Sequence, residues 1–126
     1  MLPLFSIITV TYNARKALER TLQSVGGQTY GEIEYVVIDG GSTDGTMEQV
    51  AHWEAEVADE RTRHGIEPMR CVIVSEPDRG LYDAMNKGLK RATGNYLWFL
   101  NAGDTFKSPE TVAQLAEVAE RNGMPD

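Results

Sequence analysis

The sequence lacks several features that would assign it to a familiar class of protein. A single cysteine, Cys71, excludes an internal disulfide, and its apolar neighbours indicate a buried, unreactive thiol. No apolar run approaches the roughly 20 residues of a membrane span, and the N-terminus has no basic segment followed by a signal-type apolar stretch. These absences favour a protein of the reducing cytoplasm.

Positive charge is also scarce, with 12 Lys and Arg against 19 Asp and Glu and a formal net charge of −7. This balance argues against a general nucleic-acid-binding protein, which needs a basic face. An anionic substrate would have to be held locally, by a metal ion, helix N-termini or a few basic side chains. The two histidines, His52 and His64, lack metal-ligand spacing to each other or to Cys71, which argues against a zinc site.

Three common active-site motifs are missing as well. No G-x-G-x-x-G follows the first predicted strand, which disfavours a dinucleotide-binding fold of the usual kind. No G-x-x-x-x-G-K-[ST] is present, which disfavours a P-loop, and Ser42 lacks the G-x-S-x-G context of a hydrolase nucleophile.

Predicted strands and helices alternate along the whole chain. This order predicts an α/β domain over residues 1–126, with a mostly parallel sheet and helices on both faces. The chain ends at residues 123–126, where another strand is expected, which indicates a C-terminal truncation within a larger domain. Residues 61–68 are interpreted as a basic, exposed loop. Strands are predicted at residues 4–10, 33–38, 71–74 and 96–100, and helices begin after Asn13, after residues 42–44, at Leu81 and at residues 108–110.

Two of the predicted strands end on acidic turns. Asp104 closes the turn Asn101-Ala102-Gly103-Asp104, and Asp39 precedes two glycines. Ligands of open α/β sheets bind beyond the carboxyl ends of the strands, and Mg²⁺ or Mn²⁺ uses one or two carboxylates together with substrate phosphates. The two turns therefore predict a nucleotide-diphosphate site.

The turns after the other two strands are less specific. Thr11, Tyr12 and Asn13 could present amide groups and an aromatic ring to a base, or Asn13 could simply cap the following helix while Tyr12 packs. Asp78, Arg79 and Gly80 are candidate base or phosphate contacts at the start of a helix that carries Asn86 on its outer face. The alternative is an ordinary capped turn followed by a solvent-exposed helix face.

Taken together and in order, these segments resemble the family-2 glycosyltransferases with the Rossmann-like GT-A fold. The resemblance rests on residues 6–13, 23–25, 28–30, 34–46, 76–80, 84–88, 92–94 and 100–104. It implies that Asp104 meets a divalent cation, Mn²⁺ or Mg²⁺, and the diphosphate. The residues that it implies for the nucleotide pocket are Thr11, Tyr12, Asn13, Asp39, Asp78, Arg79, Gly80, Asn86 and Asn101.

The resemblance also implies an activity: transfer of a sugar, usually from a UDP-sugar and with inversion, to a glycan or lipid-linked acceptor in polysaccharide or cell-surface glycan synthesis. The full-length enzyme would work in the cytoplasm or at the cytoplasmic face of the membrane. Asn101 and Gly103 replace two acidic residues usual in the family, which leaves metal dependence open. Two alternatives are a nucleotidyltransferase and a sugar-nucleotide-binding module without turnover.

The general base of an inverting member is expected beyond Asp126, so the catalytic residue is not identified and this fragment is expected to bind nucleotide without transferring sugar. The missing next strand of the sheet also predicts self-association through the sheet.

Overall fold

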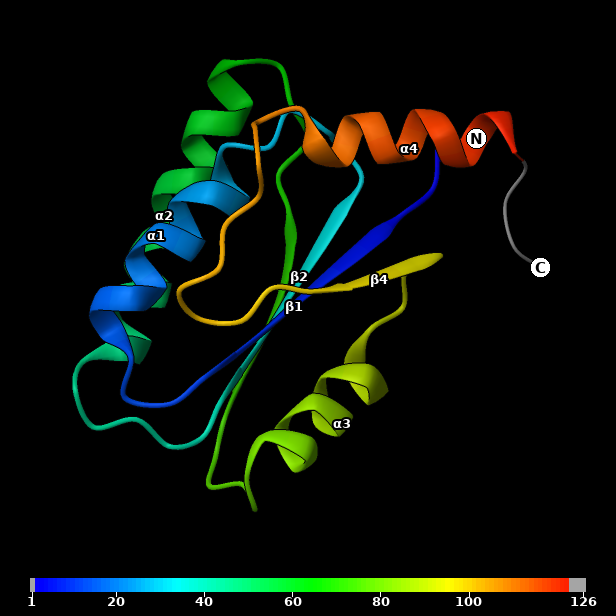
Figure 1. The fold of residues 1–126 in the computed structure, drawn as a ribbon. Coiled ribbons are helices and arrows are strands. Elements are labelled where there is room, and N and C mark those ends of the chain that lie inside the picture. Colours follow the sequence, from blue (N-terminus) through cyan, green and yellow to red (C-terminus); the bar gives the residue numbers. More distant parts are fainter. Residues whose placement is uncertain (1, 123–126) are drawn as a thin grey trace.

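The computed structural model describes residues 2–122 as a parallel sheet between two layers of helices (Figure 1). The predicted stop at residues 123–126 lies outside the described residues. Four strands lie in the order β3-β2-β1-β4. The strands are β1 (Phe5–Thr11), β2 (Ile33–Asp39), β3 (Arg70–Ser75) and β4 (Tyr96–Phe99), and the helices are α1 (Arg15–Gly26), α2 (Thr46–Arg63), α3 (Leu81–Arg91) and α4 (Thr111–Arg121).

The strand register aligns the carboxyl ends of the three longer strands. Thr11 at the end of β1 pairs with Asp39 at the end of β2, which in turn pairs with Ser75 at the end of β3. The central strands are buried on both faces, as their near-continuous apolar sequences predict for a parallel sheet. The loops that follow the strands therefore emerge together at one edge of the sheet.

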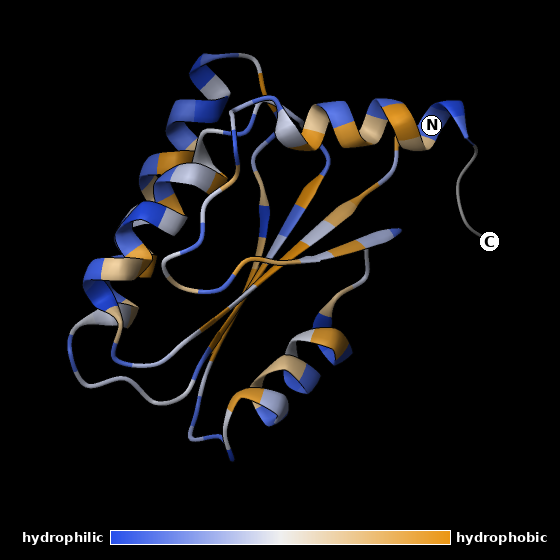
Figure 2. Cartoon of the chain, viewed as in Figure 1, coloured by the Kyte–Doolittle hydropathy of each residue, from blue (hydrophilic) through white to orange (hydrophobic). Residues whose placement is uncertain are grey.

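Helices cover both faces of the sheet, which confirms the predicted architecture. The larger core lies between the sheet and helices α1, α2 and α4, and the smaller core lies beneath α3, which stands alone on its face (Figure 1). The apolar residues concentrate along the strands and the inner helix surfaces (Figure 2). Helix α3 approaches closely because Gly88 has no side chain: a Cβ there would lie 2.5 Å from Ile8 Cγ2.

The predicted exposed loop at residues 61–68 is wrong in its first part. Helix α2 continues to Arg63, and Arg61 is only 2% exposed. Its guanidinium donates hydrogen bonds to the backbone oxygens of Gln28 at 2.7 Å, Tyr30 at 2.6 Å and Glu67 at 2.8 Å. Arg61 is therefore a buried residue whose hydrogen bonds link the segment between α1 and β2 to the segment between α2 and β3.

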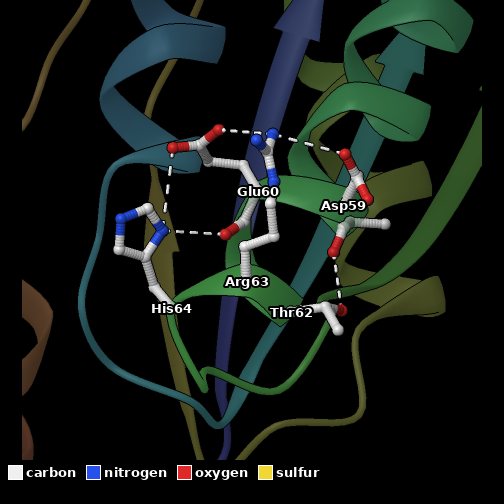
Figure 3. A network of polar contacts seen from close by, with 6 residues as sticks. Asp59, Glu60, Thr62, Arg63 and His64 are labelled. Atoms are coloured by element: carbon white, nitrogen blue, oxygen red, sulfur yellow. Dashed lines mark hydrogen bonds and ion pairs between the residues drawn. The ribbon is translucent and has the colours of Figure 1, made fainter.

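The outer end of α2 carries an exposed charge network (Figure 3). Arg63 lies 3.3 Å from Asp59 and 3.0 Å from Glu60, while Nδ1 of His64 lies 2.9 Å from the backbone oxygen of Glu60. Exposed pairs of this kind contribute little to stability, roughly 0–1 kcal/mol each. The acidic stretch of α2 is thus a solvated face, as predicted. Within residues 2–122, no helix is long and apolar enough to cross a bilayer.

Candidate functional site

A cavity of about 320 Å³ lies at the carboxyl edge of the sheet, where the loops after β1, β3 and β4 converge. It brings together several residues that the sequence predicts to bind nucleotide, although they come from distant parts of the chain. A larger groove, about 1250 Å³, runs between α1 and α2. That groove is lined mainly by charged side chains of α1 and α2 and includes Asn13 but none of the other predicted nucleotide contacts, so the smaller cavity is the better candidate. The cavity is lined by Val10, Thr11, Tyr12, Asp78, Gly80, Leu81, Ala84, Asn101 and Ala102.

One wall of this region depends on the absence of a side chain at Gly40. A Cβ at this position would lie 2.9 Å from Oδ2 of Asp78 and 3.2 Å from Cδ1 of Tyr12. The glycine therefore lets the loop after β2 approach both residues. Tyr12 is 61% exposed, so its ring is available to stack on a flat ligand. Asp78 accepts a hydrogen bond from the amide of Gly80 at 3.1 Å, which orients its carboxylate.

The structure buries Asp39 completely, with an exposed fraction of 0%. Its Oδ2 accepts hydrogen bonds from the amides of Gly41 at 3.1 Å and Ser42 at 2.8 Å and from the hydroxyl of Ser75 at 2.8 Å. Among the described residues, its Oδ1 accepts a single hydrogen bond, from the hydroxyl of Ser42. The carboxylate thus organises the loop after β2 and joins it to the end of β3.

Asn13 links two loops and does not cap α1, so the capping role that its sequence position allowed is wrong. It adopts a left-handed backbone with φ of 46°, and the residue at the N-cap position of α1 is Ala14, which has no capping side chain. Its amide donates to the hydroxyl of Ser42 at 2.8 Å, and its Oδ1 accepts the amide of Thr43 at 2.8 Å. The side chain is therefore committed to the neighbouring loop, which explains why it cannot serve the helix.

Asp44 takes the capping role instead. Its carboxylate accepts the amides of Arg15 at 3.2 Å and Thr46 at 3.2 Å, and also the hydroxyl of Thr46. These hydrogen bonds, led by the Thr46 hydroxyl, hold the pKa of Asp44 below its ordinary value. One carboxylate thus satisfies the first amides of both α1 and α2, as expected for an acidic residue at a helix N-terminus.

Thr21 of α1, which no sequence pattern singles out, holds the turn after β4 by hydrogen bonds. The Thr21 hydroxyl donates to the backbone oxygen of Asp104 at 2.7 Å and accepts the amide of Gly103 at 2.9 Å. Thr21 is fully buried on the inner face of α1. A threonine among apolar helix positions carries no distinctive sequence pattern, because its partners lie more than 80 residues away.

Within this turn, Asn101 and Asp104 contact each other and the end of β1. The amide of Asn101 donates to Oδ2 of Asp104 at 3.2 Å, and the amide of Asp104 donates to the backbone oxygen of Asn101 at 2.8 Å. Oδ1 of Asn101 accepts the amide of Val10 at 3.4 Å. Asn101 reaches the cavity, whereas the exposed carboxylate of Asp104 lies outside its lining.

The residues described do not form a metal cage of their own. Across residues 2–122, no three His, Cys, Asp or Glu side chains lie close enough together to hold an ion. Asp104 nevertheless keeps an exposed carboxylate, of which Oδ2 accepts one amide. A single carboxylate fits Mg²⁺ or Mn²⁺ when substrate phosphates and water supply the other ligands.

Four of the nine predicted nucleotide contacts lie outside the cavity lining: Asn13, Asp39, Arg79 and Asn86. Arg79 and Asn86 are both exposed, the first before α3 and the second on its outer side. The amide of Arg79 donates to Oδ2 of Asp83 at 2.9 Å, which fixes the entrance to α3. Neither side chain is brought to the cavity in this structure.

The fold and the cavity define the class: a Rossmann-like α/β domain with a ligand site at the carboxyl edge of its parallel sheet. The model of glycosyl transferase family 2 matches residues 6–124, and the chain belongs to that family. Its fold is GT-A.

The chain is similar in sequence to two glycosyltransferases with a biosynthetic assignment. It is 40% identical over 114 residues to a PGL/p-HBAD biosynthesis glycosyltransferase of Mycobacterium bovis (strain BCG / Pasteur 1173P2), covering 90% of this chain and 41% of that protein. It is 37% identical over 120 residues to the putative teichuronic acid biosynthesis glycosyltransferase TuaG of Bacillus subtilis (strain 168), covering 95% and 44%. The chain thus spans about two fifths of the length of the curated relatives that it matches.

Two solved structures share the fold. The chain matches S. aureus TarS 1-349 in complex with UDP-GlcNAc with a TM-score of 0.76 and 26% identity, covering 94% of this chain and 31% of that one. It matches the mannosyltransferase PcManGT from Pyrobaculum calidifontis, in complex with GDP-Man and Mn²⁺, with a TM-score of 0.73 and 31% identity, covering 90% and 31%.

Proposed function

We propose that this chain is the nucleotide-sugar-binding part of an inverting glycosyltransferase that uses a UDP-sugar in polysaccharide or cell-surface glycan synthesis at the cytoplasmic face of the membrane. The observation that carries the proposal is the cavity at the carboxyl edge of the sheet. It gathers five of the candidate residues from three loops: Thr11, Tyr12, Asp78, Gly80 and Asn101. The UDP-GlcNAc bound to TarS supports a uridine nucleotide as ligand.

The cavity residues have chemistry suited to a nucleoside. The exposed ring of Tyr12 offers a stacking surface, and the carboxylate of Asp78 can accept hydrogen bonds from ribose hydroxyls or base N–H groups. The hydroxyl of Thr11 is buried and has no hydrogen-bond partner within residues 2–122. An unsatisfied buried hydroxyl costs free energy, so we propose that bound nucleotide satisfies it.

We further propose that Asp104 binds Mn²⁺ or Mg²⁺ when a nucleotide diphosphate is present. The metal would neutralise charge on the leaving diphosphate. Within this chain, Thr21 and Asn101 would hold the Asp104 turn in position. The Mn²⁺ in the PcManGT complex supports a divalent cation in this fold.

Calorimetry of UDP binding tests the site and the metal separately. We expect tighter binding with Mn²⁺ than with EDTA, and we expect Asp104→Ala to abolish only that difference. Asp59→Ala, on the exposed end of α2, is the matched control for removal of one surface carboxylate. Equal UDP affinity with Mn²⁺ and EDTA would refute the metal role, and no UDP binding at all would refute the nucleotide site.

The second candidate is a nucleotide-sugar-binding module without turnover. The single carboxylate at Asp104 and the amide at Asn101 favour it, because both reduce the negative charge available to a metal. We expect this chain to bind the donor without transferring sugar, since general-base help is worth roughly 10²–10⁴-fold and we propose that the base lies outside residues 1–126. Transfer should be assayed side by side with a version extended at its C-terminus. Comparable transfer by the two would place the whole catalytic set within this chain.

A further inference from the structure

Asn13 has an unusual backbone conformation for a residue with a side chain. Its φ is 46°, and it is the one non-glycine residue with a positive φ in the described range 2–122. This left-handed conformation costs free energy for any residue with a Cβ, although asparagine tolerates it better than most. Such a conformation persists only where the surrounding contacts enforce it, and it is concentrated at functional sites.

The contacts of Asn13 join the loop after β1 to the loop after β2, and the two loops run side by side (Figure 1). The amide of Asn13 donates to the hydroxyl of Ser42, and its Oδ1 accepts the amide of Thr43, both at 2.8 Å. We call these two hydrogen bonds the Asn13 clasp. At the start of the same loop, the backbone oxygen of Thr11 accepts the amide of Gly40 at 3.0 Å. The two loops are therefore joined at residues 11 and 13.

Tyr12 lies between these two anchored residues. Its side chain is 61% exposed and lines the cavity, whereas Asn13 lies outside the cavity lining. A Cβ at Gly40 would lie 3.2 Å from Cδ1 of Tyr12, so the ring rests against the backbone of the loop after β2. An exposed ring whose backbone is fixed on both sides loses less conformational freedom when it binds a ligand.

Support of helix α1 does not account for the Asn13 clasp. The N-cap position of α1 is Ala14, and the amide of Arg15 donates to Asp44. Both hydrogen bonds of the clasp are exposed to solvent, where water competes for the same groups and the net gain in stability is small. The remaining effect of the clasp is on the position of Tyr12.

We propose that Asn13 is a positioning residue of the nucleotide site, which holds the ring of Tyr12 where a nucleobase stacks on it. Asn13 acts through Tyr12 and makes no contact with the nucleotide. Loss of the clasp leaves the ring mobile, so that a bound nucleoside must order it again. The stacking rests on the proposed function, whereas the effect of the clasp on Tyr12 is present without a ligand.

Two substitutions of Asn13 separate its backbone conformation from the clasp. Asn13→Gly adopts a positive φ without strain but removes Oδ1. Asn13→Asp keeps an oxygen that can accept the amide of Thr43, and aspartate also tolerates the left-handed region. Because ordering one side chain on binding costs about 2- to 12-fold in affinity, Asn13→Gly should weaken uridine binding by that factor, and Asn13→Asp should retain the parental affinity. Calorimetry with uridine, which carries no charge that the new carboxylate could repel, measures both.

The matched control is Asn95→Gly, at the opposite end of the sheet. Oδ1 of Asn95 accepts the amide of Leu4 at 2.9 Å in an exposed position, so the same change removes the same kind of hydrogen bond. Asn95→Gly should leave uridine affinity unchanged, and thermal unfolding of each variant shows whether the fold is intact. Equal losses of affinity in the two glycine variants would overturn the proposal.

A double-mutant cycle tests whether Asn13 acts through Tyr12. In a chain that carries Tyr12→Ala, Asn13→Gly should no longer change uridine affinity, because no ring remains to be positioned. A loss that persists in this background would indicate direct contact between Asn13 and the nucleotide, and the positioning role would be wrong.

Nuclear magnetic resonance tests the clasp without a ligand. The parent and Asn13→Asp should show a nuclear Overhauser effect between the ring protons of Tyr12 and the α-protons of Gly40, and Asn13→Gly should lose most of it. An unchanged effect in Asn13→Gly would contradict the positioning role. If the parent binds no uridine, the nucleotide site itself is refuted, and this measurement still decides whether Asn13 positions Tyr12.

Discussion

Asp39 offers the sharpest test of how the nucleotide site works, because its two carboxylate oxygens have different surroundings. Within residues 2–122, Oδ2 accepts three donors, from Gly41, Ser42 and Ser75, whereas Oδ1 accepts one, the rotatable hydroxyl of Ser42. Oδ1 is therefore the oxygen that a base N–H could reach after Ser42 turns away. We predict that Asp39 recognises the base through Oδ1.

The variant Asp39→Asn separates this contact from the support of the loop. The three donors at Oδ2 would hold the asparagine oxygen in that place, which leaves the NH₂ group where Oδ1 was. A base N–H would then meet a donor, and the loss of one charge-assisted hydrogen bond, roughly 1.5–3 kcal/mol, lowers uridine affinity about 10- to 150-fold. Because the hydroxyl of Ser42 can rotate to accept the NH₂, the free energy of unfolding should fall by only about 1 kcal/mol.

Asp39→Ala removes both the predicted contact with the base and the support of the loop after β2. It leaves the amides of Gly41 and Ser42 without their acceptor, so the free energy of unfolding should fall by roughly 2–4 kcal/mol, at about 1–2 kcal/mol for each amide. Ser75→Ala is the matched control: it removes one donor from Oδ2, leaves Oδ1 unchanged and should spare uridine affinity. Calorimetry with uridine and urea unfolding measure the two effects. If Asp39→Asn binds uridine as the parent does, the carboxylate acts only through the loop and our reasoning fails.

Two further predictions concern the opposite end of the sheet. Burial alone would raise the pKa of Glu34, but hydrogen bonds, chiefly from Thr93, lower it below the ordinary value of 4.5. The ionised Glu34 carboxylate therefore stabilises the fold fully above pH 4.5, and this stabilisation is lost as the pH falls through the lowered pKa. Glu34→Gln should lower the free energy of unfolding by about 2 kcal/mol at pH 7, measured by urea unfolding. The difference between the variant and the parent should shrink in acid. A constant difference down to pH 2 would contradict this. Gly94→Ala should destabilise by about 1–3 kcal/mol, since a Cβ would lie 2.6 Å from Ser6 Oγ, whereas Gly31→Ala, with its nearest neighbour at 3.9 Å, should have little effect on thermal unfolding.

The positions of the strands along the chain and their parallel arrangement follow closely from the sequence. The first strand was predicted at residues 4–10 and lies at Phe5–Thr11, because a chain segment buried on both faces must be apolar at almost every position. Parallel strands with helical crossovers then bring the carboxyl ends to one edge. This is why residues as distant as Tyr12 and Asn101 could be expected at one site before the fold was known.

Side chains with long-range partners were predicted less well. Arg61 follows an acidic helix and precedes a glycine and a proline, a pattern typical of a solvated loop. Its three acceptors are backbone oxygens of Gln28, Tyr30 and Glu67, and a backbone oxygen leaves no mark in the sequence. The same is true of Thr21, whose partners are backbone groups of the turn after β4.

Asp39 and Asp78 show what decides how deeply a carboxylate after a strand is buried. Asp39 and Asp78 both follow predicted strands and both lie close to glycines, so the sequence assigned them the same role. Asp39, however, is the last residue of β2, which has a neighbouring strand on each side, so surrounding loops cover its carboxylate. Asp78 lies three residues beyond the end of β3, at the edge of the sheet, and lines the cavity. The position of a strand within the sheet therefore determines how deeply its terminal carboxylate is buried, and that position depends on the strand order, which no local pattern contains.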